Sequence, residues 1–146
     1  MRSMFLPFER VFDDETSRWC LTGRDRFGEE FGVGVAPDPD EAAGRLRDWV
    51  LDSLLAAAGD QEDRLGDLLP ECPAEGDCLV FGPSDLLPVR IRLLRARHGW
   101  RQSEVADRLG ISQQAYAKLE RPGANPELQT LVRVERALEA PLLEYA

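Results

Sequence analysis

The stretch QSEVADRLGISQQAYAKL, residues 102–119, constrains the fold of this 146-residue chain more than any other. It predicts two short helices joined by a tight turn. Ala106 is small where the two helices would have to approach closely, Gly110 supplies the turn, and Ile111 is an apolar plug behind it. Ser112 can cap the second helix. This register is typical of a helix-turn-helix.

The second of these helices would present its N-terminal residues to base edges in a DNA major groove. Gln113 and Gln114 carry amides that can pair bidentately with adenine. Ala117 and Lys118 would share their exposed face, and Lys118 suits a phosphate or a guanine. The other predicted DNA-binding residues are Gln102, Ser112, Arg97, Arg101 and Asn125. The alternative is a helical hairpin that serves only protein contacts.

Charge divides the chain into two parts. Residues 1–87 hold 8 Arg and 20 Asp or Glu, whereas residues 88–146 hold 10 Lys or Arg and 7 Asp or Glu. The balances are −12 and +3, although the whole chain carries −9. The helix-turn-helix pattern lies in the basic part, so the acidic total is no objection to DNA binding. The acidic part suggests a second surface for a second partner, or serves only solubility.

Other features favour a reduced, soluble protein without a cofactor. No apolar run approaches the roughly 20 residues of a membrane helix, and the N-terminus lacks a secretory pattern, so we expect cytoplasm and no membrane partner. The three cysteines form no C-x-x-C, which favours reduced thiols over zinc. Asp38, Asp40 and Glu41 could bind a divalent metal, but acids at a helix start serve capping and the dipole. We therefore expect no enzyme.

The first 82 residues predict a small sheet domain. Three strands, MFLPFERVF, RWCLTG and FGVGVA, are followed by a long amphipathic helix that Asp38 or Asp40 can cap, and CLVF is a fourth strand. Gly32 and Gly34 fall on one face of the third strand, which indicates close approach by a helix or another backbone. The expected domain is an antiparallel β-β-β-α-β unit that resembles a truncated ribonuclease H-like fold.

The second part predicts an all-helical DNA-binding domain at residues 88–146, after a linker at residues 83–87. Four helices are expected, at VRIRLLRARH, RQSEVADRL, SQQAYAKLE and ELQTLVRVERALE, before PLLEYA closes the chain. Leu128, Leu131, Val134 and Leu138 share one stripe of the fourth helix. The fold class of the whole chain is α+β, and the predicted helical core comprises Leu94, Ala106, Leu109, Ile111, Leu119, Leu131 and Val134.

Residues 88–143 resemble the helix-turn-helix domain of phage repressor-like (XRE-type) regulators. The likeness rests on Gln102, Ala106, Gly110-Ile111-Ser112, Leu119-Glu120, and Asn125-Pro126 followed by Leu128 and Leu131. It implies dimers on palindromic operators, with Gln113 and Gln114 at the base-reading start of the recognition helix. Two positions depart from the family. Tyr116 stands where a smaller branched apolar residue is usual, and Arg101 replaces a Ser or Thr, so the helix that follows Arg101 lacks a side-chain cap.

The first domain resembles the HicB family of antitoxins. The likeness rests on the segment from Trp19 to Leu54, in which a strand, a hairpin and a second strand precede a helix that starts after Asp-Pro-Asp. The sequence GVAPDPD stands in place of the family's usual Pro-Gly-Cys. The resemblance implies that residues 1–82 bind and block a small basic RNA-cleaving toxin, HicA, while the C-terminal domain represses the operon.

The sequence therefore predicts a repressor of double-stranded DNA that forms a homodimer or homotetramer and neutralises a basic HicA-like toxin. The alternative is a stand-alone XRE-type regulator whose first domain oligomerises or senses a small ligand. A metal-dependent nuclease is the third class.

Overall fold

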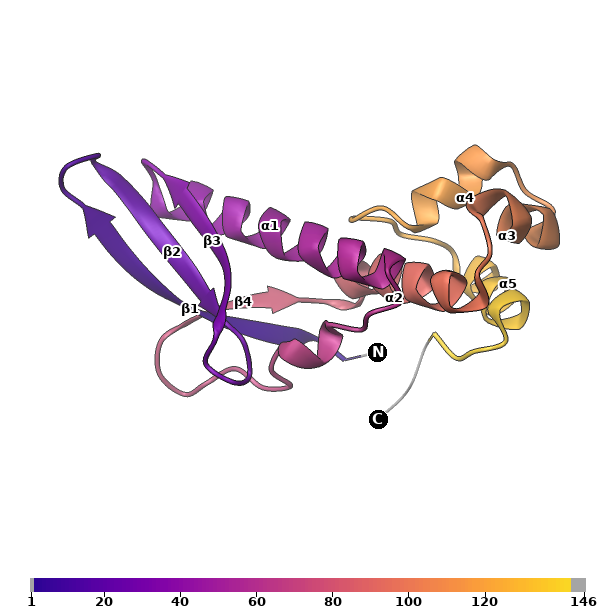
Figure 1. Ribbon diagram of the computed structural model, residues 1–146, viewed down its shortest axis with the longest axis horizontal. Coiled ribbons are helices and arrows are strands. Elements are labelled where there is room, and N and C mark those ends of the chain that lie inside the picture. The colour runs from indigo at the N-terminus through magenta and orange to yellow at the C-terminus, as the bar shows by residue number, and fades with distance from the viewer. Residues whose placement is uncertain (1, 143–146) are drawn as a thin grey trace. The chain divides into compact units, whose positions relative to one another are not determined.

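The computed structural model describes residues 2–142 and has the expected α+β class (Figure 1). The first elements follow the predicted β-β-β-α-β order: β1 (Met4–Asp13), β2 (Arg18–Arg24), β3 (Glu30–Ala36), α1 (Pro39–Gly59), the short 3₁₀ helix η1 (Leu65–Asp67) and β4 (Asp77–Phe81). Four helices follow: α2 (Pro83–His98), α3 (Gln102–Leu109), α4 (Gln113–Leu119) and α5 (Leu128–Leu138). The end of the predicted PLLEYA segment, residues 143–146, lies outside the described residues.

The chain divides into two compact units. The sheet unit comprises residues 3–54 and 64–81, and the helical unit comprises, among the described residues, residue 2 and residues 55–63 and 82–142. The last turns of α1 thus belong to the helical unit, where the carbonyl of Leu55 accepts a hydrogen bond from Arg92 at 3.3 Å. The predicted domain boundary at residue 82 and the likeness to a ribonuclease H-like fold stay predictions.

The four strands form one antiparallel sheet in the order β3-β2-β1-β4. Helix α1 packs on one face of the sheet, where Leu6, Leu21 and Phe81 are buried with Leu46 and Val50 of the helix. Apolar side chains recur at helical spacing along α1 and at every second position of the strands, so both patterns direct one face into this core.

The close approach predicted at the two strand glycines is confirmed. A Cβ atom at Gly34 would lie 2.6 Å from the backbone nitrogen of Leu46 and would overlap the carbonyl oxygen of Ala42. At Gly32 the backbone is left-handed, with φ at 93°, and a Cβ atom would lie 2.8 Å from the ring of Trp49. Helix α1 can therefore reach β3 only because both positions lack a side chain.

Asp38 caps α1, as its position before the helix predicted. Its Oδ1 accepts the backbone N–H groups of Asp40 at 2.8 Å and Glu41 at 3.1 Å. The Glu41 carboxylate is paired with Arg45 at 2.9 Å. Two of the three acids that could have bound a metal thus have structural roles. Asp38 caps α1, and Glu41 forms an ion pair one turn along the same helix.

The cysteines are free thiols, as predicted. Cys72 is exposed, and Cys20 and Cys78 are half-buried. Burial, and then the neighbouring thiol of Cys72, raises the pKa of Cys78 to about 12. The Cys78 side chain therefore stays protonated at neutral pH.

A hydrophobic core of the helical unit is built mainly from α2 to α5. Six of the seven predicted core residues are buried in it, and Ile111 is half-buried and packs against it. The predicted stripe on α5 is wrong at Leu128, which is 64% exposed, whereas Leu131, Val134 and Leu138 are buried. Leu128 is the first residue of α5, one turn too early to face the core.

Residues 83–87 are helical, where a linker was expected. Pro83 stands at the first position of α2, and the carboxylate of Asp85 accepts the N–H of Gly82 at 2.9 Å. Leu86 and Leu87 are buried. Pro88 is the sixth residue of α2, where its ring removes the backbone N–H that would donate to the carbonyl of Ser84. Apolar burial therefore outweighs the two prolines that suggested a loop.

Among residues 2–142, no helix is long and apolar enough to cross a membrane.

Candidate nucleic-acid interface

The turn between α3 and α4 has the predicted geometry. Gly110 adopts a left-handed conformation with φ at 68°, and the N–H of Ile111 donates to the carbonyl of Ala106 at 3.1 Å. The hydroxyl of Ser112 accepts the N–H of Ala115 at 3.1 Å, so Ser112 caps α4. Ala106 is 1% exposed beneath the turn. Each of the four positions therefore has the structural role that its residue type indicated.

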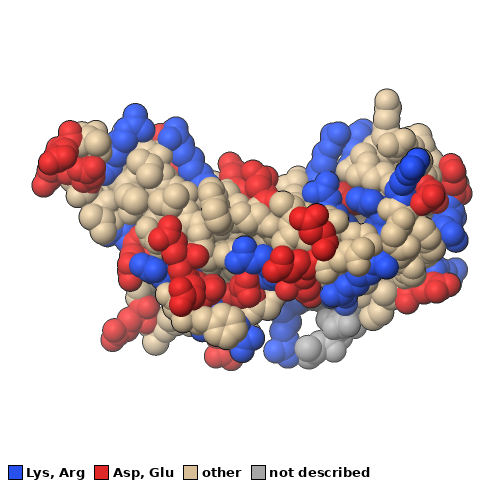
Figure 2. Space-filling model, viewed as in Figure 1, with Lys and Arg blue, Asp and Glu red and all other residues tan. Residues whose placement is uncertain are grey.

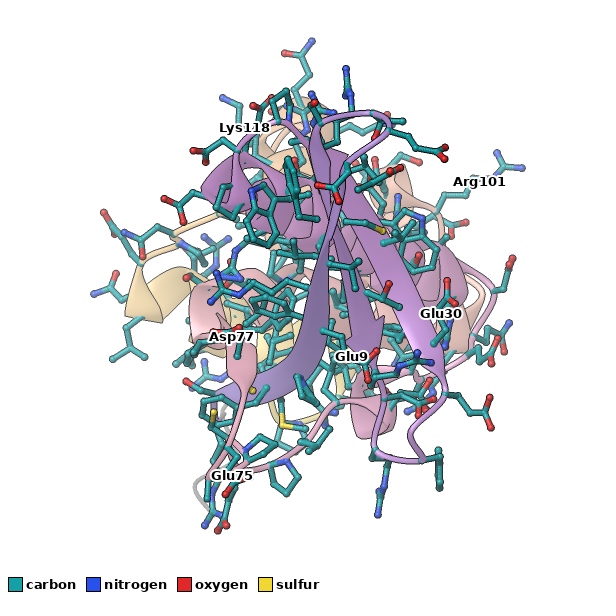
Figure 3. All side chains as sticks on the ribbon, turned by 90° about the vertical axis from the view of Figure 1, so that its left-hand side faces the viewer. Glu9, Glu30, Glu75, Asp77, Arg101 and Lys118 are labelled. Carbon is teal, nitrogen blue, oxygen red and sulfur yellow. The ribbon has the colours of Figure 1, made fainter. Side chains whose placement is uncertain are left out.

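Helix α3 begins without a side-chain cap from Arg101, in agreement with the departure noted in the sequence. The carboxylate of Glu104 instead accepts the backbone N–H of Arg101 at 2.7 Å. This contact is the acidic half of a capping box and stabilises the helix start without a Ser or Thr. The side chain of Arg101 is consequently exposed and extends away from the helices (Figure 3).

Helix α4 presents a polar and basic surface. Gln113, Gln114, Ala117 and Lys118 line one shallow hollow of about 540 Å³, and the fifth residue around it is Arg121. Gln113, Gln114, Lys118 and Arg121 are exposed. The structure therefore brings the predicted recognition residues onto one face, and their contact with DNA stays a prediction.

Sequence reasoning did not single out Arg121. It follows Lys118 by three residues, and this spacing places the two cations on neighbouring positions of a helical surface. The separation was the signal available in the sequence. Arg121 lies just after the end of α4, beyond the stretch that the helix-turn-helix pattern covers.

The remaining predicted contacts lie elsewhere on the helical unit. Gln102 is half-buried at the first position of α3, where backbone N–H groups point beyond the helix end. Arg97 is exposed in the last turn of α2. Asn125 lines a different hollow, of about 270 Å³, together with Ser84, Leu87 and the loop after α4. Asn125 is thus not among the residues grouped on the α4 surface.

A buried charge network supports α4 from behind. The Glu120 carboxylate follows α4 and is only 1% exposed. It accepts hydrogen bonds from Nε and Nη2 of Arg95 at 2.7 and 2.8 Å, and Arg92 approaches it at 3.4 Å. A further Arg95 nitrogen donates to the carbonyl of Trp100 at 2.9 Å. Bidentate pairing of this kind fixes α2 relative to the end of α4.

The ring of Tyr116 packs wholly inside the core, at 0% exposed. Its hydroxyl is buried without a hydrogen-bond partner among the described residues. Burial, followed by the nearby charge of Glu120, raises the pKa of Tyr116. The departure from the family pattern is therefore accommodated by the core and leaves one polar atom unpaired.

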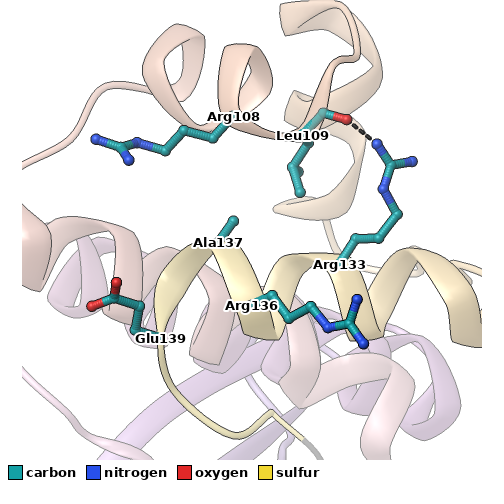
Figure 4. A pocket seen from close by; sticks show the side chains of 6 residues that line it. All are labelled: Arg108, Leu109, Arg133, Arg136, Ala137 and Glu139. Carbon is teal, nitrogen blue, oxygen red and sulfur yellow. Dashed lines mark hydrogen bonds between the residues drawn. The ribbon is translucent and has the colours of Figure 1, made fainter.

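A second basic hollow lies between α3 and α5, lined in part by Arg108, Arg133, Arg136 and Glu139 (Figure 4). Arg133 donates a hydrogen bond to the carbonyl of Leu109, the last residue of α3. Carbonyls at a helix C-terminus lack partners within the helix, so this contact both satisfies one and joins α5 to α3.

His98 has a structural setting. Its ring stacks on Trp100 with centroids 4.1 Å apart, and its Nε2 lies 2.6 Å from the carbonyl oxygen of Leu138. Since that oxygen can only accept, Nε2 must carry the proton. No group of three His, Cys, Asp or Glu within residues 2–142 is arranged to hold a metal ion.

Comparison with known families agrees with this geometry. Residues 91–145 match a helix-turn-helix family. The chain thus contains a helix-turn-helix domain of the DNA-binding XRE type in its C-terminal part. No curated protein matches the chain significantly.

Proposed function

We propose that this chain is a sequence-specific repressor that binds a palindromic operator in double-stranded DNA, and that it is the antitoxin of a HicAB-type pair. The observation that carries the DNA-binding part is the surface of α4. Two glutamines and Lys118 are exposed around one hollow, on a helix whose opposite side is buried in the core, and Arg121, just after the helix end, borders the same hollow.

In the proposed complex, α4 enters the major groove. Gln113 and Gln114, at its first turn, pair with adenine edges, and Lys118 contacts a guanine or a phosphate. The first turn of α3, with Gln102, is directed at a backbone phosphate. The ion pair between Arg95 and Glu120 keeps α4 at a fixed angle, because it joins the end of α4 to α2. Two copies of the chain then read the two halves of a palindrome.

Selection from fragmented genomic DNA tests this proposal. The full chain is immobilised, and bound fragments are recovered at about 150 mM salt and sequenced. We expect a small set of palindromic sites bound at least about 10³-fold more tightly than bulk DNA. The control is the double variant Gln113→Ala/Gln114→Ala, which should not enrich those sites. Equal recovery of all fragments by the wild type would contradict sequence-specific binding.

The proposed second partner is a small basic protein. The sheet unit contains seven Arg against sixteen Asp and Glu, a balance of −9. Asp13, Asp14 and Glu15 are exposed at the end of the β1–β2 hairpin, and Figure 2 shows acidic side chains gathered there, on the left. A strongly acidic surface attracts a basic partner and accelerates its association. With the HicB resemblance, these charges support a toxin as that partner.

Affinity purification from the native cells tests the partner. The tagged full chain should retain a small basic protein, and the complex should not cleave RNA until the toxin is released. In the charge-reversed variant Asp13→Lys/Asp14→Lys we expect weaker retention, with DNA binding unchanged. The cells must express the genes on either side of the one that encodes this chain. Recovery of the chain from such cells without a basic protein would refute the antitoxin role and leave the DNA-binding proposal intact.

The alternative is a stand-alone regulator whose first domain oligomerises. One observation favours it, namely the apolar side chains exposed on the sheet. Oligomerisation through the sheet and toxin binding through the acidic surface are nevertheless compatible, because they require different chemistry.

A further inference from the structure

One face of the sheet is packed against α1, and the opposite face, here named the open face, is exposed. Val35, Cys20 and Val11 lie side by side across β3, β2 and β1, and Val33 lies beside Thr22 in the next row. Residues directly opposite each other in paired strands project to the same side. Leu21 and Gly34 form the row between these two rows, and both face α1. The residues of the two rows on either side therefore project away from the helix.

The open face is unusually apolar for a surface in water. Val11 is 63% exposed, and Val33 and Val35 are exposed by 38 and 37%. Val80 is 48% exposed but lies opposite Phe5, towards the other end of β1. A sheet covered on one side only normally alternates apolar inward residues with polar outward ones. Here β3 presents valines outward at both positions. A contiguous apolar surface of this kind marks an interaction site.

A partner would bind to the open face of the sheet rather than to its edges. Both edge strands have a carbonyl already occupied by an arginine of α1. Arg45 donates to the carbonyl of Val35 at 2.6 Å, and Arg47 donates to that of Val80 at 2.7 Å. A strand that added to either edge would have to displace these bonds. A partner that packs on the valines would not.

The charge of the open face identifies the partner. The sheet unit carries −9, so most of its surface repels a second copy. On the open face, Glu9 is paired with Arg24 at 3.4 Å, Asp13 stands opposite Arg18, and Glu30 stands opposite Arg24. The central row of Val11, Cys20 and Val35 carries no formal charge. Glu9 and Asp77, labelled in Figure 3, come from neighbouring strands, but Asp77 lies on the α1 side, paired with Arg10. The three acids and two arginines of the open face sum to −1, so a basic protein gains little electrostatic attraction from the open face, and a second copy meets little repulsion there.

We infer that the open face binds the open face of a second copy of this chain. The contact is isologous, valine rows on valine rows, with the two sheets packed face to face about 10 Å apart. Each copy offers the other one Glu9 and one Arg24. This homodimer forms without DNA and without a toxin, so the inference does not depend on the proposed function.

Val132, an exposed valine outside the open face, serves as a matched control. Val132 on α5 is 36% exposed, almost the same as Val35, but Arg133 and Arg136 border it. A symmetric contact there would bring four arginines together. A substitution at Val132 therefore introduces the same change in a similar setting outside the proposed interface.

Sedimentation velocity of the full chain, without DNA, at about 1–100 µM and 150 mM salt, tests the inference. We expect a dimer for the wild type and for Val132→Arg, and at least a tenfold larger dissociation constant for Val35→Arg. Circular dichroism verifies that each variant is folded. Should Val35→Arg fail to fold, Thr22→Arg places the charge in the adjacent row. A wild type that is monomeric throughout, or a dimer broken by Val132→Arg alone, would overturn the inference.

Thiol labelling of the wild type gives an independent measurement. Cys20 lies in the central row of the open face, whereas Cys72 is exposed on a loop. Maleimide modification of Cys20, followed by peptide mass mapping, should slow at least tenfold as the protein concentration rises through the dissociation constant, and that of Cys72 should not. Cys20 labelling that is independent of concentration, or that slows only when a different protein is added, would contradict self-association. Loss of operator binding in Gln113→Ala would leave both measurements unchanged.

Discussion

Arg95 donates two hydrogen bonds to the carboxylate of Glu120, from Nε at 2.7 Å and from Nη2 at 2.8 Å, at a place where Glu120 is almost wholly buried. The pairing raises the pKa of Arg95, first through the hydrogen bond to Glu120, so the guanidinium stays charged. A buried ion pair contributes little net stability as long as it is complete. Removal of one partner is different, because it leaves the other charge desolvated and unpaired.

Glu120→Ala should therefore lower the free energy of unfolding by about 3–5 kcal/mol. Urea unfolding followed by circular dichroism measures the loss. Glu127→Gln removes an exposed carboxylate from the same unit and should change stability by less than about 0.5 kcal/mol. Equal effects of the two substitutions would show that the ion pair is not a structural element.

Tyr116→Phe should keep the stability of the helical unit or raise it by up to about 1 kcal/mol. The substitution removes a buried hydroxyl that has no hydrogen-bond partner, and such groups cost about 1–3 kcal/mol when desolvated. Tyr116→Val, in contrast, should lose about 2–4 kcal/mol because it leaves a cavity. Denaturant midpoints of the two variants and the wild type provide the comparison. A clear loss in Tyr116→Phe would mean that the hydroxyl bonds to the Glu120 network.

Because of the same hydroxyl, the free energy of unfolding should depend on pH in the alkaline range. Burial raises the pKa of Tyr116 in the folded chain above the value of about 10 in the unfolded chain. Above that pH the unfolded state loses a proton that the folded state retains, so stability falls as the pH rises. The difference in unfolding free energy between wild type and Tyr116→Phe should be constant from pH 7 to 9. Above about pH 10 the difference should shift against the wild type by about 1.4 kcal/mol per pH unit. A difference that stays flat up to pH 11 would exclude a raised pKa.

The sequence predicted those parts of the fold that depend on local pattern. Alternation specified the strands, and Gly34 indicated the close approach of α1, because only glycine leaves room for a helix backbone there. Gly110 and Ser112 specified the turn through their own conformational and capping preferences. In each case the cause of the structure lies within a few residues of the signal.

The parts that the sequence did not predict depend on contacts between distant residues. Residues 83–87 resembled a linker because of two prolines, and only the core contacts of Leu86 and Leu87 make them helical. Leu128 fitted the apolar stripe of α5, but its place at the helix start leaves it exposed. Gly32 and Gly34 indicated the face of β3 that α1 approaches, but whether another part of the chain covers Val33 and Val35 depends on the fold as a whole.

Two glycine substitutions should act in opposite directions on the sheet unit. Gly34→Ala should destabilise it by more than about 2 kcal/mol, because the new Cβ atom would overlap the backbone of α1 at Ala42 and Leu46. Gly44→Ala should stabilise it by about 0.5–1 kcal/mol, since Gly44 is an exposed position inside α1 with open space around it. Thermal unfolding of both variants tests the pair. Stability gained in both would show that α1 does not pack closely on β3.

Substitutions on α4 should separate base reading from phosphate anchoring. Gln113→Ala or Gln114→Ala should cost about 1–3 kcal/mol of binding free energy on the selected operator and relax the base preference at one position. Lys118→Ala and Arg121→Ala should instead weaken binding to all sequences and reduce the slope of log affinity against log salt by about 1 each, because one phosphate contact is lost. Gln129→Ala, on the exposed side of α5, is the control and should change neither property. Fluorescence anisotropy at 50–200 mM salt, with the operator and with scrambled DNA, distinguishes the two effects. If both glutamine variants keep full affinity and preference, α4 is not the recognition helix.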